Sequence, residues 1–126
     1  MKIKQYQVKQ FMQAAGQDCP DKPVIPNAEV TTLRYRLIQE ELDEYSEAVH
    51  NNDVVGVADA IGDLLVVVLG AAVAHGIDIE PIFNEIHRSN MTKFIDGHRR
   101  EDGKWIKGPS YTPADLEPIL KAQVQP

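Results

Sequence analysis

The segment from Val54 to His75 constrains the fold most, because it has the length of a helix and is apolar on nearly every face. A helix without a polar face has to be buried by protein or by lipid. Its most apolar part, Leu64–Ala74, spans 11 residues, whereas about 20 are needed to cross a bilayer. Asp53 before the segment and Gly76 after it suit the two helix caps. We therefore expect a core helix of a cytoplasmic protein, with no membrane partner.

Three further helices are predicted on either side of this segment. They cover residues 2–15, residues from an Asn27 N-cap to about 49, and residues 79–94 after an Asp78 cap. The stretch 16–28 contains three prolines and is predicted to be a loop. Short connections between the last three helices favour antiparallel neighbours. The expected fold class is all-α, an antiparallel four-helix bundle in one domain over residues 1–126.

The periodicity also predicts which side chains face the core, and where the chain becomes irregular. An irregular C-terminal tail is expected after residue 95, with a short hairpin around Arg100 and Trp105 and a final helical turn over residues 112–115. Trp105 and Tyr111 either stack on a ligand base or pack the tail. The predicted inner residues of the first and fourth helices are Val8, Phe11, Met12, Ala15, Ile82, Phe83 and Ile86.

Carboxylates interrupt the apolar stripe of the second helix. The stripe begins with Val30, Leu33 and Leu37, and the same face continues with Glu41 and Glu44. Glu40 and Glu47 stand beside them. Neighbouring carboxylates that lose hydration repel one another and need a compensating cation. The alternative is a solvated acidic face held by ion pairs, although nothing basic lies between Glu40 and His50.

The third helix carries acids in an equally unexpected place. Asp59 and Asp63 are one turn apart, and Asp63 directly precedes the run Leu64–Leu69. Asp is a poor helix former and is rarely buried without a partner. One interpretation is a hydrogen bond to a neighbouring Arg or backbone group. The other is that two antiparallel helices direct Glu40, Glu41, Glu44, Asp59 and Asp63 into one space, where an all-carboxylate cluster suits Mg²⁺ or Mn²⁺.

The fourth helix supplies groups of the opposite character. Asn90 and Lys93 are three positions apart within His87-Arg88-Ser89-Asn90-Met91-Thr92-Lys93. Beside a carboxylate–metal cluster, an amide and an ammonium group could bind a phosphate chain. Taken alone, Lys93 is typical of a surface lysine near a helix C-terminus.

Together these segments resemble the all-α nucleoside triphosphate pyrophosphohydrolases, which include MazG-like, phosphoribosyl-ATP pyrophosphohydrolase-like and dimeric dUTPase-like proteins. The resemblance rests on Glu40-Glu41-Leu42-Asp43-Glu44, on Asp59-Ala60-Ile61-Gly62-Asp63-Leu64-Leu65 and on residues 85–93. Residues 100–109 resemble the tail of a MazG-like subgroup. The resemblance covers the chain from about residue 27 onward and implies a bundle of the MazG-like type.

The resemblance implies a Mg²⁺-dependent hydrolysis of a nucleoside triphosphate to the monophosphate and pyrophosphate, as in enzymes that sanitise nucleotide pools. By the family's motif, Glu41, Glu44 and Asp63 match metal ligands, and Glu40 matches an acid that binds metal or orients water. Glu40 or Glu41 is the predicted general base. Asn90 and Lys93 match substrate-binding positions. The family usually has Glu at the position of Ala60, and Asp59 is the predicted replacement ligand.

Other functions remain open at this level. One is a true phosphoribosyl-ATP pyrophosphohydrolase, and another is a non-catalytic nucleotide-binding dimer module. A di-iron bundle is disfavoured, because Glu47-Ala48-Val49-His50 is the chain's single Glu-x-x-His motif and two are needed.

Charge and cysteine content limit the partners. The net charge is −6, which disfavours binding to nucleic-acid phosphates. A single cysteine, Cys19, is typical of a reducing compartment. The apolar third helix needs more cover than one chain of this size offers, which predicts a homodimer or a dimer of dimers.

Overall fold

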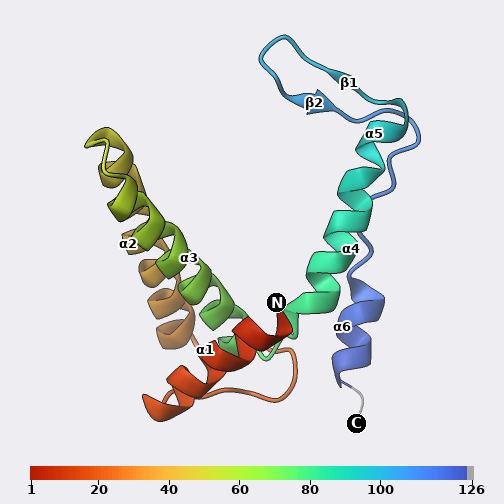
Figure 1. Ribbon diagram of the computed structural model, residues 1–126. Coiled ribbons are helices and arrows are strands. Elements are labelled where there is room, and N and C mark those ends of the chain that lie inside the picture. Colours follow the sequence, from red (N-terminus) through yellow and green to blue (C-terminus); the bar gives the residue numbers. More distant parts are fainter. Residues whose placement is uncertain (125–126) are drawn as a thin grey trace. The chain divides into compact units, whose positions relative to one another are not determined.

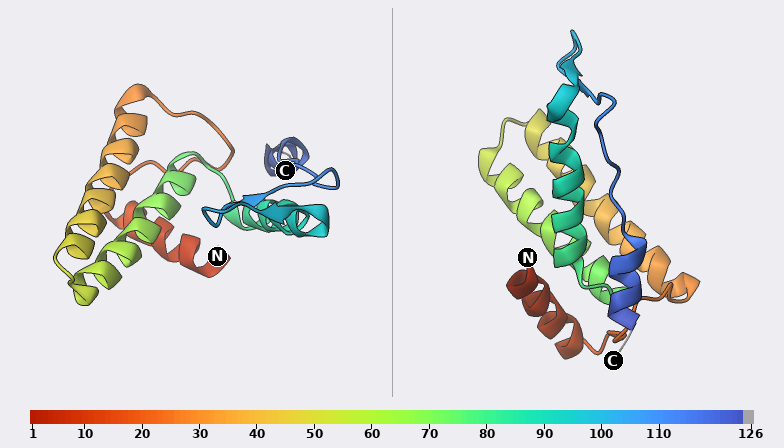
Figure 2. Two further views of the ribbon diagram at one scale, coloured as in Figure 1. Left: turned by 90° about the horizontal axis from the view of Figure 1, so that it is seen from above. Right: turned by 90° about the vertical axis from the view of Figure 1, so that its right-hand side faces the viewer.

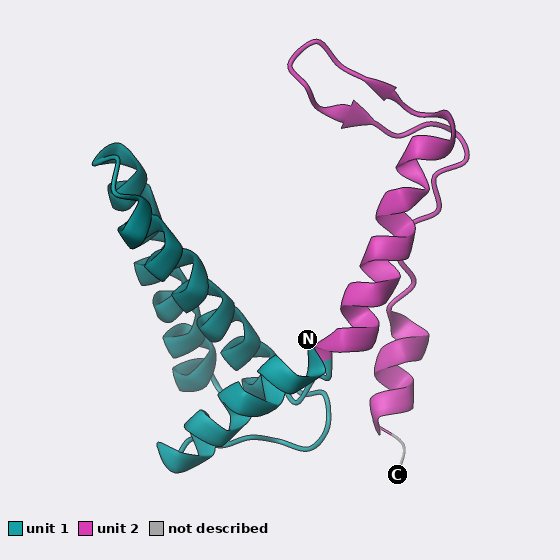
Figure 3. Ribbon diagram, in the orientation of Figure 1, with its two compact units in different colours: residues 1–78 teal, residues 79–126 magenta. Residues whose placement is uncertain are grey.

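The computed structural model describes residues 1–124, which form two compact units: residues 1–78 and the chain from residue 79 onward (Figure 3). Helices dominate both units, and the described residues contain one small two-stranded sheet. The predicted all-α class is therefore confirmed. The first three helices belong to the first unit and the fourth to the second, so the four-helix bundle is not confirmed. A single domain over the whole chain stays a prediction.

The first unit is built on an antiparallel helix pair. Helices α2 (Ala28–His50) and α3 (Val54–Ala74) lie side by side and are joined by a three-residue turn (Figures 1 and 2). Side-chain oxygens fix both helix starts: Asn27 accepts a hydrogen bond from the Val30 N–H, and Asp53 accepts one from the Gly56 N–H. The predicted caps and helix starts are confirmed.

Helix α1 (Lys2–Ala14) packs against α3 and is followed by the proline-rich loop. The loop is pinned to the end of α3, because the Val24 N–H donates to the His75 carbonyl. Gly76 has φ +66°, and a Cβ there would lie 2.1 Å from the Lys22 carbonyl oxygen, so only glycine fits this helix end.

The core of the first unit includes fewer residues of α1 than the apolar pattern predicts. Val8 and Met12 of α1 are buried, but Phe11 is 67% exposed and Ala15 is also exposed. Phe11 instead lines an apolar groove between α1 and α3. The prediction that Phe11 and Ala15 belong to the core is therefore wrong. The reason is that α1 contacts α3 along a thin stripe of residues four positions apart.

Helix α3 is buried at its C-terminal end and exposed over much of the rest. Leu69 and residues 72–74 are buried, whereas Ile61, Leu65, Val66 and Val68 are about half exposed. Within residues 1–124, α3 is the one helix long and apolar enough to span a membrane, by length and composition. Its 18-residue window has a mean hydropathy of 2.1, and 17% of that window is buried. Within the described residues, the predicted core helix is therefore buried mainly toward its C-terminal end.

The second unit begins with α4 (Ile79–Met91), followed by the short α5 (Lys93–Asp96). The predicted helix 79–94 is thus interrupted at Thr92, whose hydroxyl donates to the Ser89 carbonyl and accepts from the Thr112 N–H. Of the predicted inner residues, Ile82 is buried, whereas Phe83 and Ile86 are 52% and 40% exposed.

The predicted hairpin is confirmed. Strands β1 (His98–Arg99) and β2 (Trp105–Ile106) pair antiparallel, and Gly103 has φ +91° in the turn. Trp105 packs against Phe94 at a ring-centroid distance of 5.0 Å and donates from Nε1 to the Lys93 carbonyl at 2.6 Å. Trp105 therefore packs the tail.

The predicted helical turn over residues 112–115 is wrong, and the tail is less irregular than expected. Residues 112–115 are extended, and helix α6 (Glu117–Val124) follows them. The extended segment is bound along α4: the Thr112 carbonyl accepts from the Ser89 hydroxyl, and the Asp115 N–H donates to Glu85. Backbone groups engaged with α4 are not available for a local helical turn.

Candidate metal centre

Three carboxylates from the two antiparallel helices converge in the first unit. Glu41 and Glu44 lie one turn apart on α2, and Asp63 faces them from α3. One ligand oxygen from each residue lies within 4.8 Å of the others. Carboxylate oxygens at this spacing are the donors that hard divalent cations prefer. We call these three residues the acidic cluster.

Of the three residues in the acidic cluster, Glu41 has the least favourable electrostatic environment. Its Oε2 atom is buried and has no hydrogen-bond partner among the described residues. Burial, followed by a hydrogen bond and a like charge from Glu44, raises the pKa of Glu41 to about 7. The charges of Asp63 and Asp59 raise this pKa further. A buried carboxylate oxygen without a donor is where a cation fits.

Ion pairs do not neutralise the cluster. Among residues 1–124, none of Glu41, Glu44 and Asp63 forms an ion pair within 4.0 Å, whereas Glu85–Arg88, Arg100–Asp102 and Glu117–Lys121 do. Arg34, the nearest preceding arginine of α2 on this face, donates instead toward Met12 and Gln17. Of the alternative interpretation, the solvation is present, because Glu44 is exposed, but the ion pairs are not formed by these three residues.

The other predicted acids lie at the edge of the cluster. Glu40 is exposed on α2 and is not one of the three converging residues. Asp59 is also exposed and outside this group, although its charge acts on Glu41. Ala60 is 1% exposed, so position 60 packs in the core and leaves no oxygen there.

A cavity of about 340 Å³ adjoins the cluster and is lined by Glu41 and Asp63. Its remaining polar lining residues are Arg34 and Gln17, and α1 and α3 supply apolar walls. The sequence analysis did not single out Arg34 and missed this role. The available signal was its spacing, since Val30, Arg34, Leu37 and Glu41 share one face of α2.

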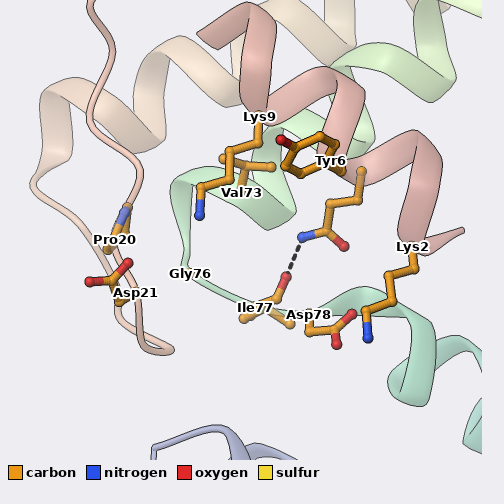
Figure 4. A pocket seen from close by; sticks show the side chains of 10 residues that line it. Lys2, Tyr6, Lys9, Pro20, Asp21, Val73, Gly76, Ile77 and Asp78 are labelled. Atoms are coloured by element: carbon orange, nitrogen blue, oxygen red, sulfur yellow. Dashed lines mark hydrogen bonds between the residues drawn. The ribbon is translucent and has the colours of Figure 1, made fainter. Parts of the chain in front are cut away.

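A second cavity of the first unit, about 280 Å³, contains none of the acidic cluster (Figure 4). Pro20 and Asp21 lie at one end of it and Lys2 and Asp78 at the other, so its lining carries both signs of charge (Figure 4). Gln5 crosses it and donates to the Ile77 carbonyl at 2.6 Å. The bond ties α1 to the residues that follow α3.

The predicted substrate-binding residues lie in the second unit. Asn90 is exposed in the last turn of α4, and Lys93 is the first residue of α5. The Lys93 ammonium lies 5.9 Å from the Tyr111 ring centroid, and Lys107 lies 4.5 Å from it. Tyr111 thus contacts two lysines.

The fold and the carboxylates together define an all-α protein with an acidic centre suited to a divalent cation. Comparison with known families is consistent with this class: residues 8–90 match the model of the phosphoribosyl-ATP pyrophosphohydrolase family. The chain belongs to this family, which is part of the all-α MazG-like nucleoside triphosphate pyrophosphohydrolase superfamily. The suspected superfamily is confirmed. The match includes the acidic cluster, Arg34 and Asn90, and it ends before Lys93. No curated protein matches the sequence.

Proposed function

We propose that this protein hydrolyses a nucleoside triphosphate to the nucleoside monophosphate and pyrophosphate, with Mg²⁺ as cofactor and Mn²⁺ as a substitute. The observation that carries the proposal is the acidic cluster, in which three carboxylates converge around a buried oxygen without a donor. Family membership supports the reaction class, because pyrophosphohydrolases of this superfamily are generally dependent on divalent metals.

The donor set fits the proposed ion. Glu41, Glu44 and Asp63 offer oxygen ligands without nitrogen or sulfur, which suits Mg²⁺ or Mn²⁺ and disfavours zinc or copper. Asp59, and Glu40 at the exposed edge, are proposed as further ligands. A bound divalent cation would neutralise the phosphates and lower the pKa of a bound water.

The protein's own carboxylates have two tasks in this proposal. Glu44 and Asp63 hold the cofactor, and Glu41 or its neighbour Glu40 accepts the proton of the attacking water. Glu41 is one of the three converging residues, whereas Glu40 precedes it on α2, is exposed and lies outside the converging group. Glu40→Gln and Glu41→Gln, compared in one pH–rate experiment, distinguish the two candidate bases.

Asn90 and Lys93 are proposed to bind the substrate, Lys93 through a phosphate and Asn90 through the sugar or an adjacent oxygen. A lysine ammonium is a point charge suited to phosphate oxygens. Lys93→Ala should raise the KM for the nucleotide without changing the metal affinity. A KM equal to that of the parent protein would make Lys93 an ordinary surface residue.

The decisive experiment is a pyrophosphate-release assay over nucleoside triphosphates and phosphoribosyl-ATP, with Mg²⁺ or Mn²⁺. Glu44→Gln and Asp63→Asn should each abolish turnover while circular dichroism stays helical. Asp43→Asn is the matched control, because Asp43 is exposed on α2 and accepts a hydrogen bond from Gln39 at 2.9 Å. Near-normal turnover in either cluster variant would contradict the metal centre. Nucleotide binding without pyrophosphate release would indicate the non-catalytic module.

We also propose that the protein is at least a homodimer. Leu65, Val66 and Val68 of α3 are about half exposed, although a largely apolar helix has to be covered. Lipid is the less favourable cover, because Asp59 and Asp63 lie on the same helix and each charge at a bilayer centre costs about 2.5–3.5 kcal/mol. Light scattering at micromolar concentration should give twice the chain mass or more, and a monomer mass would reject the dimer.

A further inference from the structure

The cavity beside the acidic cluster has two chemically different parts. Glu41 and Asp63 line it together with Arg34 and Gln17. Arg34 and Glu41 are seven residues apart on α2, which corresponds to about 10 Å along the helix axis. The volume of about 340 Å³ falls within the usual range of small-molecule pockets. The cavity therefore has room for a ligand that reaches from the carboxylates to the arginine.

Arg34 is a buried cation without a carboxylate partner. It is 7% exposed, and burial lowers the pKa of its guanidinium. Among the described residues, its guanidinium donates to the Met12 sulfur at 3.9 Å and to the Gln17 Oε1 at 3.5 Å. Two long contacts leave most of its five N–H donors without acceptors. Burying a charge in this state is unfavourable unless something else binds it.

The residues around Arg34 leave space for its guanidinium, most clearly at Gly70. A Cβ at Gly70 of α3 would lie 2.4 Å from the Arg34 Nη1 atom, so any larger residue at position 70 would displace the arginine. Asp18 and Arg34 also line an adjoining cavity of about 120 Å³, but they form no ion pair within 4.0 Å. The fold thus holds a cation next to open space and gives it no protein anion.

We infer that Arg34 and Gln17 recognise the base of the nucleotide, and that among purines they select guanine and hypoxanthine, which carry an oxo group at C6, over adenine. The inference rests on the proposed function, because the acidic cluster then holds the phosphates at the other part of the cavity. Val8, Met12 and Val67 supply apolar walls that can cover the faces of a flat base.

The selectivity between bases follows from the hydrogen-bond donors that Arg34 and Gln17 present. A guanidinium offers only N–H donors, and Gln17 turns its carbonyl oxygen to Arg34, which leaves its amide nitrogen as a second donor. The O6 and N7 atoms of guanine are adjacent acceptors that an arginine binds in a bidentate manner. Adenine presents an amino group at the position of O6, which would oppose donor to donor.

A phosphate at Arg34 is the less favourable occupant. Its oxygens would be desolvated against the apolar walls, with one cation to compensate them. A base loses little hydration from its faces and pairs its polar edge with the arginine. The base is therefore the part of the substrate that fits this end of the cavity.

The test compares kcat/KM for GTP and ITP with kcat/KM for ATP in pyrophosphate-release assays. The parent protein should prefer GTP and ITP by about 10- to 100-fold. Arg34→Met, which keeps an unbranched side chain, should reduce that ratio to within a few-fold of 1, mainly through KM. Arg36→Met is the matched control on the same helix and should keep the preference, because Arg36 is exposed and does not line this cavity.

Failure of the inference differs from failure of the proposed function. Turnover by the parent protein without the preference, or an equal loss for all nucleotides in Arg34→Met, would overturn base recognition alone. No pyrophosphate release from any nucleotide would overturn the proposed function. Calorimetric binding of GTP and ATP would then still decide the inference, since equal affinities contradict it. If Arg34→Met loses its helical signal, Gln17→Leu, which removes the second donor, should lower the same ratio.

Discussion

Glu41 in the first unit and Glu85 in the second are glutamates on helices, yet their surroundings push their charges in opposite directions. Glu41 faces Glu44 and Asp63, and its pKa is raised to about 7. Glu85 accepts from Arg88 at 2.7 and 2.9 Å and from the Asp115 N–H at 2.9 Å. These donors lower the pKa of Glu85 to about 2.

The two glutamates therefore have different roles. Glu85 stabilises the fold, whereas Glu41 is available to bind a ligand. Glu85 accepts a hydrogen bond from the Asp115 N–H and so fixes the tail segment to α4, and its partner Arg88 adds a 2.7 Å hydrogen bond to Thr112. Glu41 has a hydrogen bond with Glu44 but no ion pair, and its Oε2 atom is buried without a donor among the described residues. A carboxylate whose pKa is strongly raised, and which no basic neighbour neutralises, is typical of functional sites.

The largest expected effect separates the two glutamates by activity. Glu41→Gln should lower pyrophosphate release at least about 100-fold, because partners outside the first metal shell alone typically contribute 10–100-fold. Glu85→Gln should stay within a few-fold of the parent protein and instead loosen the tail. Steady-state kinetics measures the effect of each variant on activity. Amide hydrogen exchange over residues 110–116 measures the loosening of the tail. Equal losses of activity would break the comparison.

Much of the first unit could be predicted from the sequence because its signals are local. Asn27 and Asp53 mark helix starts through bonds to residues three positions on, and the short turn after α2 forces an antiparallel pair. The same pairing places Glu41 opposite Asp63. In the tail, the Asp102-Gly103 turn likewise predicted the hairpin.

What could not be predicted depends on contacts distant in sequence. The segment 112–115 has the composition of a helix start, but Ser89 and Glu85 of α4 bind its backbone and keep it extended. Phe11 fits the apolar stripe of α1, yet its exposure depends on how narrowly α1 meets α3. Arg34 is interpretable only when Gly70 and Gln17 are seen beside it.

A smaller effect is expected from Asp59, which acts on the acidic cluster from outside the three converging residues. Asp59→Asn removes one negative charge and a proposed ligand oxygen that reaches the metal through a bound water, so the metal concentration for half-maximal rate should rise a few-fold. An Asp59 oxygen bound directly to the metal would make that rise much larger, above about 10-fold. Metal titration of the rate measures this. An unchanged metal dependence would place Asp59 outside the site altogether.

The smallest expected effect is a pH dependence of the free energy of unfolding in the metal-free protein. The pKa of Glu41 lies above its ordinary value of 4.5, at about 7, so its contribution to folding is fully present below pH 4.5 and is lost as the pH rises through 7. Glu85 is ionised in both the folded and the unfolded chain above pH 5, because its folded-state pKa is lowered to about 2. It adds no slope between pH 5 and pH 8.

The free energy of unfolding should therefore fall by about 1–2 kcal/mol from pH 5 to pH 8, since one pKa unit is worth about 1.4 kcal/mol and solvent near the cluster screens part of the shift. Glu41→Gln should remove this part of the slope, whereas Glu85→Gln should leave it. Urea unfolding at both pH values measures the difference between each variant and the parent, so histidine titration common to all three cancels. A slope that survives in Glu41→Gln would mean that Glu41 is not the strained carboxylate.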